Sequence, residues 1–168
     1  MDHRGFTLVE TLLGVFLLLG AGGALLVGMQ QAMMSADYLR QLHAVVNAAQ
    51  GRLEQLTATP FETLATGAEF ASAWTVGRSE ALTGLPEITD GRLSIQIRQP
   101  VDDDQLNNPG NPAVVTLHVA ACWRFRGRLI AGDDKNCNGV LDADEAASGV
   151  DGLITSPVML STRMTKRS

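Results

Sequence analysis

The sequence predicts an α+β fold, in which one long N-terminal helix packs on a small antiparallel β-sheet. The first third of the 168-residue chain is apolar and then amphipathic with a helical period. Later segments alternate apolar with polar residues, as half-buried strands do. Because the helical part comes first and the strands follow without further alternation, an α+β arrangement is favoured over a parallel α/β sheet.

Composition narrows the class of protein. The chain is 45% hydrophobic and 18% charged, which is too apolar for a disordered chain, and its length suits a single core. Thirteen basic residues against eighteen acidic ones give a net charge of -5. This acidic balance gives no support for nucleic acid as a direct ligand.

The apolar excess is concentrated in residues 6–34. No ionisable residue occurs from Thr11 to Met34, and this run is long enough to cross a bilayer as a helix. A short polar leader, residues 1–5, precedes it and contains Arg4, which favours a cytoplasmic position for the leader. We therefore expect a single-pass membrane segment with the C-terminal part outside the cytoplasm.

Glu10 is the one ionisable residue between Phe6 and Met34. A carboxylate at membrane depth costs roughly 2.5–3.5 kcal/mol on insertion scales, so at that depth it would need a partner. Because Glu10 is close to the start of the run, a position at the headgroup boundary explains it equally well. The residues alone leave both interpretations open.

The run Gly5-Phe6-Thr7-Leu8-Val9-Glu10, followed by the apolar segment, resembles the class III leader of type IV pilins and type II secretion pseudopilins, the prepilin N-terminal methylation motif. The resemblance implies a pilin-like fold. It also implies that prepilin peptidase cuts between Gly5 and Phe6 and methylates the new amine of Phe6. Residues 6–34 would then remain as the membrane anchor and become the packing element of a filament.

In this family Glu10 would be the counter-ion of a neighbouring subunit's N-terminal ammonium. The implied function is that of a noncatalytic structural subunit, a minor pilin or a pseudopilin, whose partners are other pilins or pseudopilins. Its place would be the inner membrane, with the C-terminal part in the periplasm or on a surface filament. The segment 44–56, followed by Pro60-Phe61, also resembles the helix of minor pilins of the pilus-modification type.

Residues 35–59 are predicted to continue the helix in amphipathic form. Apolar residues recur there at alternating spacings of three and four, and this stripe is too short to favour a coiled-coil seam. It consists of Leu39, Leu42, Val46, Ala49, Leu53 and Leu56. The helix should run from near Phe6 to near Thr57, because Thr59-Pro60 disfavours helical geometry.

Residues 60–168 are predicted to form the sheet. A half-buried strand is expected around residues 93–98, a longer one around residues 115–124, and a last one after Pro157. The apolar face of the longer strand would comprise Val115, Leu117, Val119, Ala121 and Trp123. A turn is expected at residues 126–128, and residues 102–112 are rich in turn formers and in aspartate, as in a solvated loop.

Residues 134–145 match the spacing of an EF-hand calcium loop. Position 6 is Gly139, which permits the sharp turn, and position 7 is Val140, which can offer its carbonyl oxygen. Oxygen-bearing side chains fall at positions 1, 3, 5, 9 and 12, namely Asp134, Asn136, Asn138, Asp142 and Glu145. The spacing predicts a calcium site, but no flanking helices are expected, so an acidic turn that matches by chance is the alternative.

Cys122 and Cys137 are the only cysteines, and an extracytoplasmic position favours a disulfide between them over two free thiols. A zinc site is not supported, because no CxxC spacing occurs. No nucleophile elbow, phosphate-binding loop or His-Glu zinc helix is present, so we do not expect an enzyme. The alternative to a filament subunit is a membrane-anchored, calcium-dependent binding or adhesion module that does not polymerise.

Overall fold

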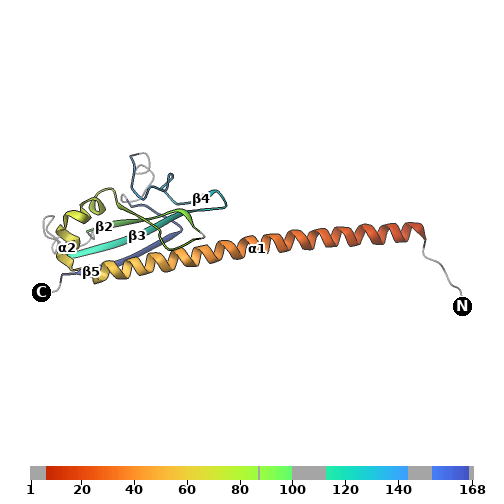
Figure 1. Ribbon diagram of the computed structural model, residues 1–168, viewed down its shortest axis with the longest axis horizontal. Coiled ribbons are helices and arrows are strands. Elements are labelled where there is room, and N and C mark those ends of the chain that lie inside the picture. Colours follow the sequence, from red (N-terminus) through yellow and green to blue (C-terminus); the bar gives the residue numbers. More distant parts are fainter. Residues whose placement is uncertain (1–6, 87, 100–112, 144–152, 167–168) are drawn as a thin grey trace. The chain divides into compact units, whose positions relative to one another are not determined.

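The computed structural model describes residues 7–86, 88–99, 113–143 and 153–166. The chain divides into two compact units, Met1–Arg40 and Gln41–Ser168. Helix α1, Leu8–Ala58, contributes to both units (Figure 1). The predicted segments 6–34 and 35–59 therefore fall largely on one continuous helix.

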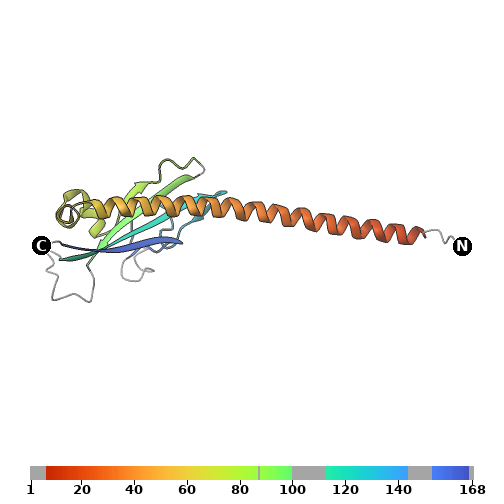
Figure 2. The same cartoon turned by 90° about the horizontal axis from the view of Figure 1, so that it is seen from below.

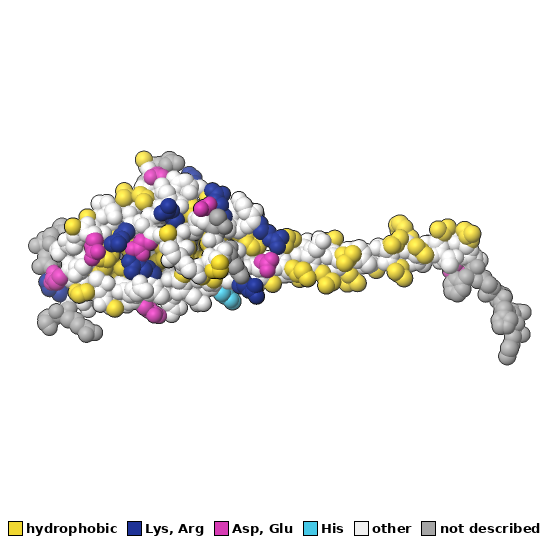
Figure 3. All heavy atoms as spheres, in the orientation of Figure 1, with side chains coloured by type: hydrophobic (Ala, Val, Ile, Leu, Met, Phe, Trp, Pro, Cys, Tyr) yellow, Lys and Arg dark blue, Asp and Glu magenta, His cyan; other side chains and the backbone are white. Residues whose placement is uncertain are grey.

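The first unit consists of the N-terminal part of α1. An 18-residue stretch of the helix has a mean hydropathy of 2.3, so α1 is long and apolar enough to cross a membrane. Its large apolar side chains are exposed, for example Phe16 by 77% and Leu25 by 70%. Figure 3 shows them along the visible face of this part of the helix. No other part of the first unit that the structure describes covers this apolar surface.

The second unit contains a five-stranded antiparallel sheet in the order β1-β2-β3-β4, with β5 also paired to β3. The strands are β1 Arg78–Ala81, β2 Thr89–Arg98, β3 Val114–Phe125, β4 Arg128–Ile130 and β5 Val158–Thr165. A short helix α2, Phe61–Thr66, and a 3-10 helix η1, Ala68–Trp74, connect α1 to the sheet. The predicted α+β class is confirmed, whereas α2, η1 and β1 were not predicted.

One face of the sheet packs on the C-terminal part of α1, as Figures 1 and 2 show. The predicted apolar face of β3 is confirmed, since its five residues are at most 1% exposed. Across the ladder, Ile95 opposes Val119 and Ile97 opposes Leu117, so the apolar residues of β2 share this face. From α1, the buried residues are Val45, Ala49 and Leu56.

The predicted apolar stripe of α1 is only partly correct. Leu42, Val46 and Leu53 are half-buried, and Leu39 is 51% exposed. Val45, absent from the predicted stripe, is fully buried. Because apolar residues occur on two adjacent lines of this helix, the position of the sheet decides which line is covered.

The opposite face of the sheet is also covered, so the prediction of a half-buried β2 is wrong. Ser94 and Gln96 are 3% and 1% exposed, although both are polar. Gln96 Oε1 accepts a hydrogen bond of 2.8 Å from the backbone N–H of Ile154. Segments 131–141 and 153–157 lie over this face and bring backbone donors that a polar side chain can satisfy.

A bidentate ion pair joins α1 to the edge strand β1. Arg52 Nε and Nη2 each lie 2.7 Å from an oxygen of the Glu80 carboxylate. Arg78 Nε lies 3.1 Å from the same carboxylate. At the C-terminal end, α1 stops at Ala58 and α2 starts after Pro60, which confirms the predicted break.

Candidate functional sites

The start of α1 is the first candidate site. Gly5 and Phe6, the predicted processing residues, lie outside the described residues. The backbone N–H of Glu10 lies 3.0 Å from the carbonyl oxygen of Thr7 and 3.3 Å from its Oγ1. Thr7 therefore occupies the N-cap position of the helix, and Glu10 follows three residues later.

This Thr-x-x-Glu spacing is that of a capping box, a signal that our sequence reasoning missed. It provides a local reason for an acidic residue at this point, because a carboxylate in the first turn also complements the helix dipole. Within the described residues no cation pairs with the Glu10 carboxylate, and its side chain is exposed. Its geometry is compatible with an intermolecular partner and does not require one.

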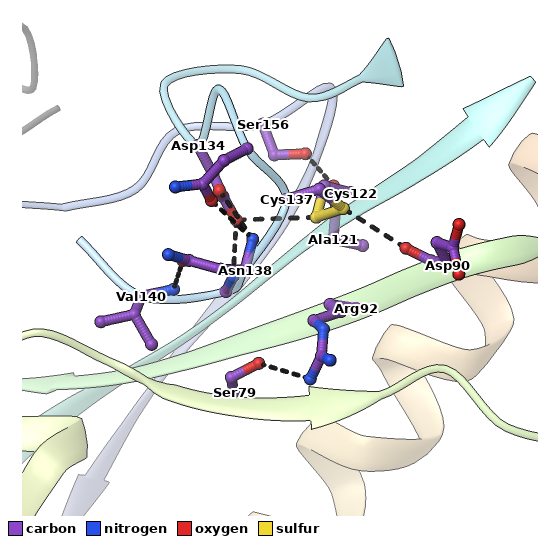
Figure 4. The surroundings of a disulfide bond; sticks show 12 residues. Ser79, Asp90, Arg92, Ala121, Cys122, Asp134, Cys137, Asn138, Val140 and Ser156 are labelled. Carbon is purple, nitrogen blue, oxygen red and sulfur yellow. Dashed lines mark hydrogen bonds between the residues drawn. A yellow bond between two sulfur atoms is a disulfide. The ribbon is translucent and has the colours of Figure 1, made fainter. Parts of the chain in front are cut away.

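The second candidate site is the loop after β4, which a disulfide joins to β3. The predicted pairing of Cys122 with Cys137 is confirmed, with Cα atoms 5.7 Å apart. Both cysteines are buried, Cys122 beneath the loop that lies over its strand. Figure 4 shows the bridge beside Asp134 and Asn138, so it attaches the predicted ligand loop directly to the sheet.

Asp134 is the buried centre of this loop and is only 2% exposed. Its Oδ1 accepts a hydrogen bond of 3.1 Å from the backbone N–H of Asn138, and its Oδ2 accepts one of 2.8 Å from Gly139. Oδ2 also lies 3.6 Å from Cys122 Sγ. This contact is not a hydrogen bond, because the sulfur is in a disulfide and carries no proton. Hydrogen bonds to backbone N–H groups stabilise the carboxylate at a buried position.

The other predicted ligand side chains gather around Asp142. Its Oδ2 accepts hydrogen bonds from Asn136 Nδ2 at 2.7 Å and from Asn138 Nδ2 at 2.9 Å. Asn136 Oδ1 accepts one of 2.9 Å from the backbone N–H of Asn138. Asn138 Oδ1 accepts one of 2.7 Å from the backbone N–H of Val140. The side chains at positions 1, 3, 5 and 9 therefore form one connected network.

Gly139 occupies the position that the calcium-loop pattern reserves for glycine, and its φ of +75° explains why. A Cβ at this position would also lie 2.7 Å from Ser79 Oγ on β1. The backbone of Leu141 is fixed to the segment before β1, since its N–H donates to Val76 O at 2.7 Å. The tight turn and its close packing both require the glycine.

The residues present fit a hard cation in part. Asp134, Asn136, Asn138 and Asp142 are brought together, and rotation of the two amides would direct their oxygens toward a shared ion. Glu145 lies outside the described residues. Among the described residues no cluster of three or more His, Cys, Asp or Glu that could hold a metal ion is found. Two of the four candidate ligands named above are asparagines, which do not count toward such a cluster.

His118, on the covered face of β3, is a titratable residue that the sequence analysis did not select. Burial, with repulsion from Arg98, lowers the pKa of His118 below its usual value of 6.5. Arg98 is itself held by the carbonyl oxygens of Trp74 at 2.9 Å and Thr75 at 3.1 Å. Only the fold brings these two side chains together, since they belong to different strands.

In comparisons with protein-family models, curated proteins and solved structures, no match to this chain was found.

Proposed function

We propose that this chain is a noncatalytic structural subunit of a type IV pilus or type II secretion pseudopilus. In this proposal prepilin peptidase cuts between Gly5 and Phe6, and residues 6–34 anchor the chain in the inner membrane. The same helix then joins other pilins or pseudopilins in a filament. Glu10 neutralises the N-terminal ammonium of the neighbouring subunit.

The observation that carries this proposal is the exposed apolar half of α1. From Leu8 to Met34 the large side chains are uncovered, and the helix continues without interruption into the unit that holds the sheet. A helix that is apolar on all sides requires a lipid or protein environment. Membrane anchoring followed by helix packing in a filament supplies both environments.

The disulfide supports an extracytoplasmic position for the second unit. Cys122 and Cys137 are bonded, and disulfides persist in oxidising compartments such as the bacterial periplasm. This agrees with a leader that stays in the cytoplasm and a chain that crosses the membrane once.

Mass spectrometry of the protein isolated from its own membranes tests the processing step. We expect a mature N-terminus at Phe6 that carries a methyl group. A Gly5→Leu variant should retain the leader, because the bulky side chain blocks the cut. A wild-type chain that still begins with Met1 would refute the assignment to this class of subunit.

We also propose that the loop from Asp134 binds calcium. The supporting observation is the network that joins Asp134, Asn138 and Asp142 around Gly139. Calcium suits oxygen ligands in an irregular arrangement, and the carbonyl oxygen of Val140 and the side chain of Glu145 would complete the set. Calcium bound there would supply a positive charge between the carboxylates and hold the loop over the sheet.

Thermal unfolding of the full chain in detergent micelles tests this site. Calcium at a hundred times its Kd should stabilise the folded chain by about 2.7 kcal/mol. Asp142→Asn should abolish most of this gain, whereas Glu69→Gln, a matched change at an exposed position, should retain it. If calcium leaves the wild-type melting temperature unchanged, the loop is only an acidic turn.

The calcium loop also favours a second candidate function, a membrane-anchored adhesion or binding module that does not polymerise. Cross-linking in the native membrane separates the two functions. A filament subunit should yield ladders of cross-linked copies or of other pilins through the first half of α1. A tethered module should yield none, whether or not calcium is present.

A further inference from the structure

The turn between β3 and β4 carries a concentrated positive charge in an acidic protein. Arg124, Arg126 and Arg128 fall within five residues, and all three are exposed. Arg126 and Gly127 have φ values of 50° and 80°, so both central residues of this two-residue turn are left-handed. The strands thus reverse over the shortest possible distance, and the arginines crowd around one tip.

The arginines surround this tip rather than lining one face. Phe125 is paired with Arg128 and Arg124 with Leu129, so Arg128 lies on the α1 side of the sheet and Arg124 on the opposite side. The guanidinium of Arg126 lies 5.7 Å from the centre of the half-buried Phe125 ring. In the part of the chain that the structure describes, no carboxylate pairs with Arg124 or Arg128. Because the arginines point to both sides of the sheet, the tip suits contact with a flat, negatively charged surface better than with a groove.

The tip lies at the end of the second unit at which α1 enters. Arg52 of α1 binds Glu80 on β1, Glu80 is paired with Leu93 on β2, and Leu93 is paired with Ala121 on β3. Arg52 is therefore connected to the half of β3 that leads to the tip. The C-terminal end of α1 lies instead near Arg163, which is paired with Thr116 at the other end of β3. Figures 1 and 2 agree, since both show the β4 turn at the end of the sheet where α1 enters this unit.

The membrane anchor ends only a few residues before this unit. Residues 35–40 connect Met34 to Gln41, so even a fully extended connection would span no more than about 25 Å. The basic tip is therefore held at high local concentration near the bilayer surface, whatever the angle between the two units.

We propose that the tip around Arg124, Arg126 and Arg128 binds the anionic phospholipid headgroups of the membrane that holds the chain's own anchor. Guanidinium groups bind phosphate in bidentate fashion, and each arginine near an anionic surface contributes about fivefold to binding. The partly exposed Phe125 ring suits the boundary between headgroups and acyl chains. This contact holds the second unit against the bilayer before assembly, and it rests on the proposed membrane anchoring.

Hydrogen exchange of the full chain in nanodiscs tests the contact. One set of nanodiscs contains phosphatidylcholine alone, and the other contains 30% phosphatidylglycerol. Amides 124–130 should exchange at least fivefold more slowly in the anionic discs, and 0.5 M NaCl should remove the difference by screening. Equal exchange in the two lipids would overturn the proposal.

Two single variants provide a matched control. Arg128→Gln should lose much of the protection, whereas Arg163→Gln should keep it, because Arg163 is exposed in the same way on β5 at the other end of the sheet. Protection that survives in an Arg124→Gln/Arg128→Gln variant would also overturn the proposal. The exchange of β2 in neutral discs reports that each variant is folded.

The same experiment separates this inference from the proposed function. A chain that does not enter nanodiscs overturns both the anchor and the headgroup contact. A chain that enters them without lipid-dependent protection overturns the headgroup contact alone. Protection that rises with protein concentration in detergent, without anionic lipid, would assign the tip to a second copy of the chain and not to the membrane.

Discussion

Glu10 is placed for two roles, which differ in what they require of its side chain. Thr7 caps the start of α1, and a glutamate three residues later can act locally in a capping box. A carboxylate at the start of an apolar helix can also be kept for a cation on another subunit. The first role needs only a hydrogen-bonding side chain, whereas the second needs a negative charge.

Glu10→Gln is therefore the informative substitution. Glutamine retains the capping role, so helix formation and membrane insertion should be unchanged. Incorporation into filaments should fall by more than a hundredfold, since leaving a buried ammonium unpaired costs roughly 3 kcal/mol or more. Immunoblots of sheared filaments against whole membranes measure the ratio. Glu54→Gln, an exposed change on the same helix, is the control, and normal assembly of Glu10→Gln would contradict the counter-ion role.

His118 gives the fold a pH dependence of known sign. Because burial and Arg98 lower the pKa of His118, the unfolded chain binds this proton before the folded chain does. The contribution to stability is complete above pH 6.5 and is lost progressively as the pH falls through the lower, folded-state pKa.

Melting temperatures at pH 7.5 and pH 5 measure this effect in detergent micelles. The wild-type chain should lose more stability between these pH values than a His118→Gln variant does. His43→Gln, an exposed histidine on α1, should behave as the wild type. Identical losses in wild type and His118→Gln would show that other groups dominate the acid sensitivity.

At the scale of elements, α1 has two environments along one helix. Its N-terminal half is exposed on all sides, and its C-terminal half buries a line of side chains against the sheet. The long helix, the central strand β3 and the last strand β5 could be predicted from the periods of their apolar residues. The end of the helix could be predicted because Pro60 disfavours helical geometry in the residue before it. The short elements α2, η1 and β1 could not be predicted, because contacts with the rest of the unit hold them in place.

Leu56→Ala and Leu39→Ala test whether α1 is buried in one part and exposed in another. Both variants make the same substitution, leucine to alanine, on the same helix. Leu56 is 1% exposed and Leu39 is 51% exposed. The first variant should lower the free energy of unfolding by about 2–5 kcal/mol, because it leaves a cavity. The second should change it by less than about 1 kcal/mol. Denaturant titration in micelles measures both, and similar losses would contradict the observed packing of α1.

At the scale of the whole molecule, the disulfide connects the candidate calcium loop to the centre of the sheet. Cys122 lies on β3, which pairs with three other strands, and Cys137 lies within the ligand loop. The bridge thereby holds segment 131–141 over a sheet face that contains Ser94 and Gln96. Segment 153–157 is held over the same face by the hydrogen bond from Ile154 to Gln96. Stability of this cover and geometry of the loop should depend on each other.

A Cys122→Ala/Cys137→Ala variant should unfold more easily by about 3 kcal/mol, since the bridge closes a sequence separation of 15 residues. It should also require more calcium for the same gain in melting temperature, because the loop is no longer held in place. Reduction of the wild-type chain under denaturing conditions, followed by refolding in reductant, is the control. If neither the double variant nor the reduced wild-type chain loses stability, a structural role for the bridge is contradicted.

The sequence by itself determined the fold class, the membrane-length apolar helix, the apolar face of β3 and the spacing of the loop from Asp134. Each depends on residues that are near one another along the chain. Only the tertiary structure decided that Val45 and not Leu39 is buried, that both faces of β2 are covered, and that burial together with Arg98 lowers the pKa of His118. These properties depend on segments that are distant in sequence, so no local period or spacing could contain them.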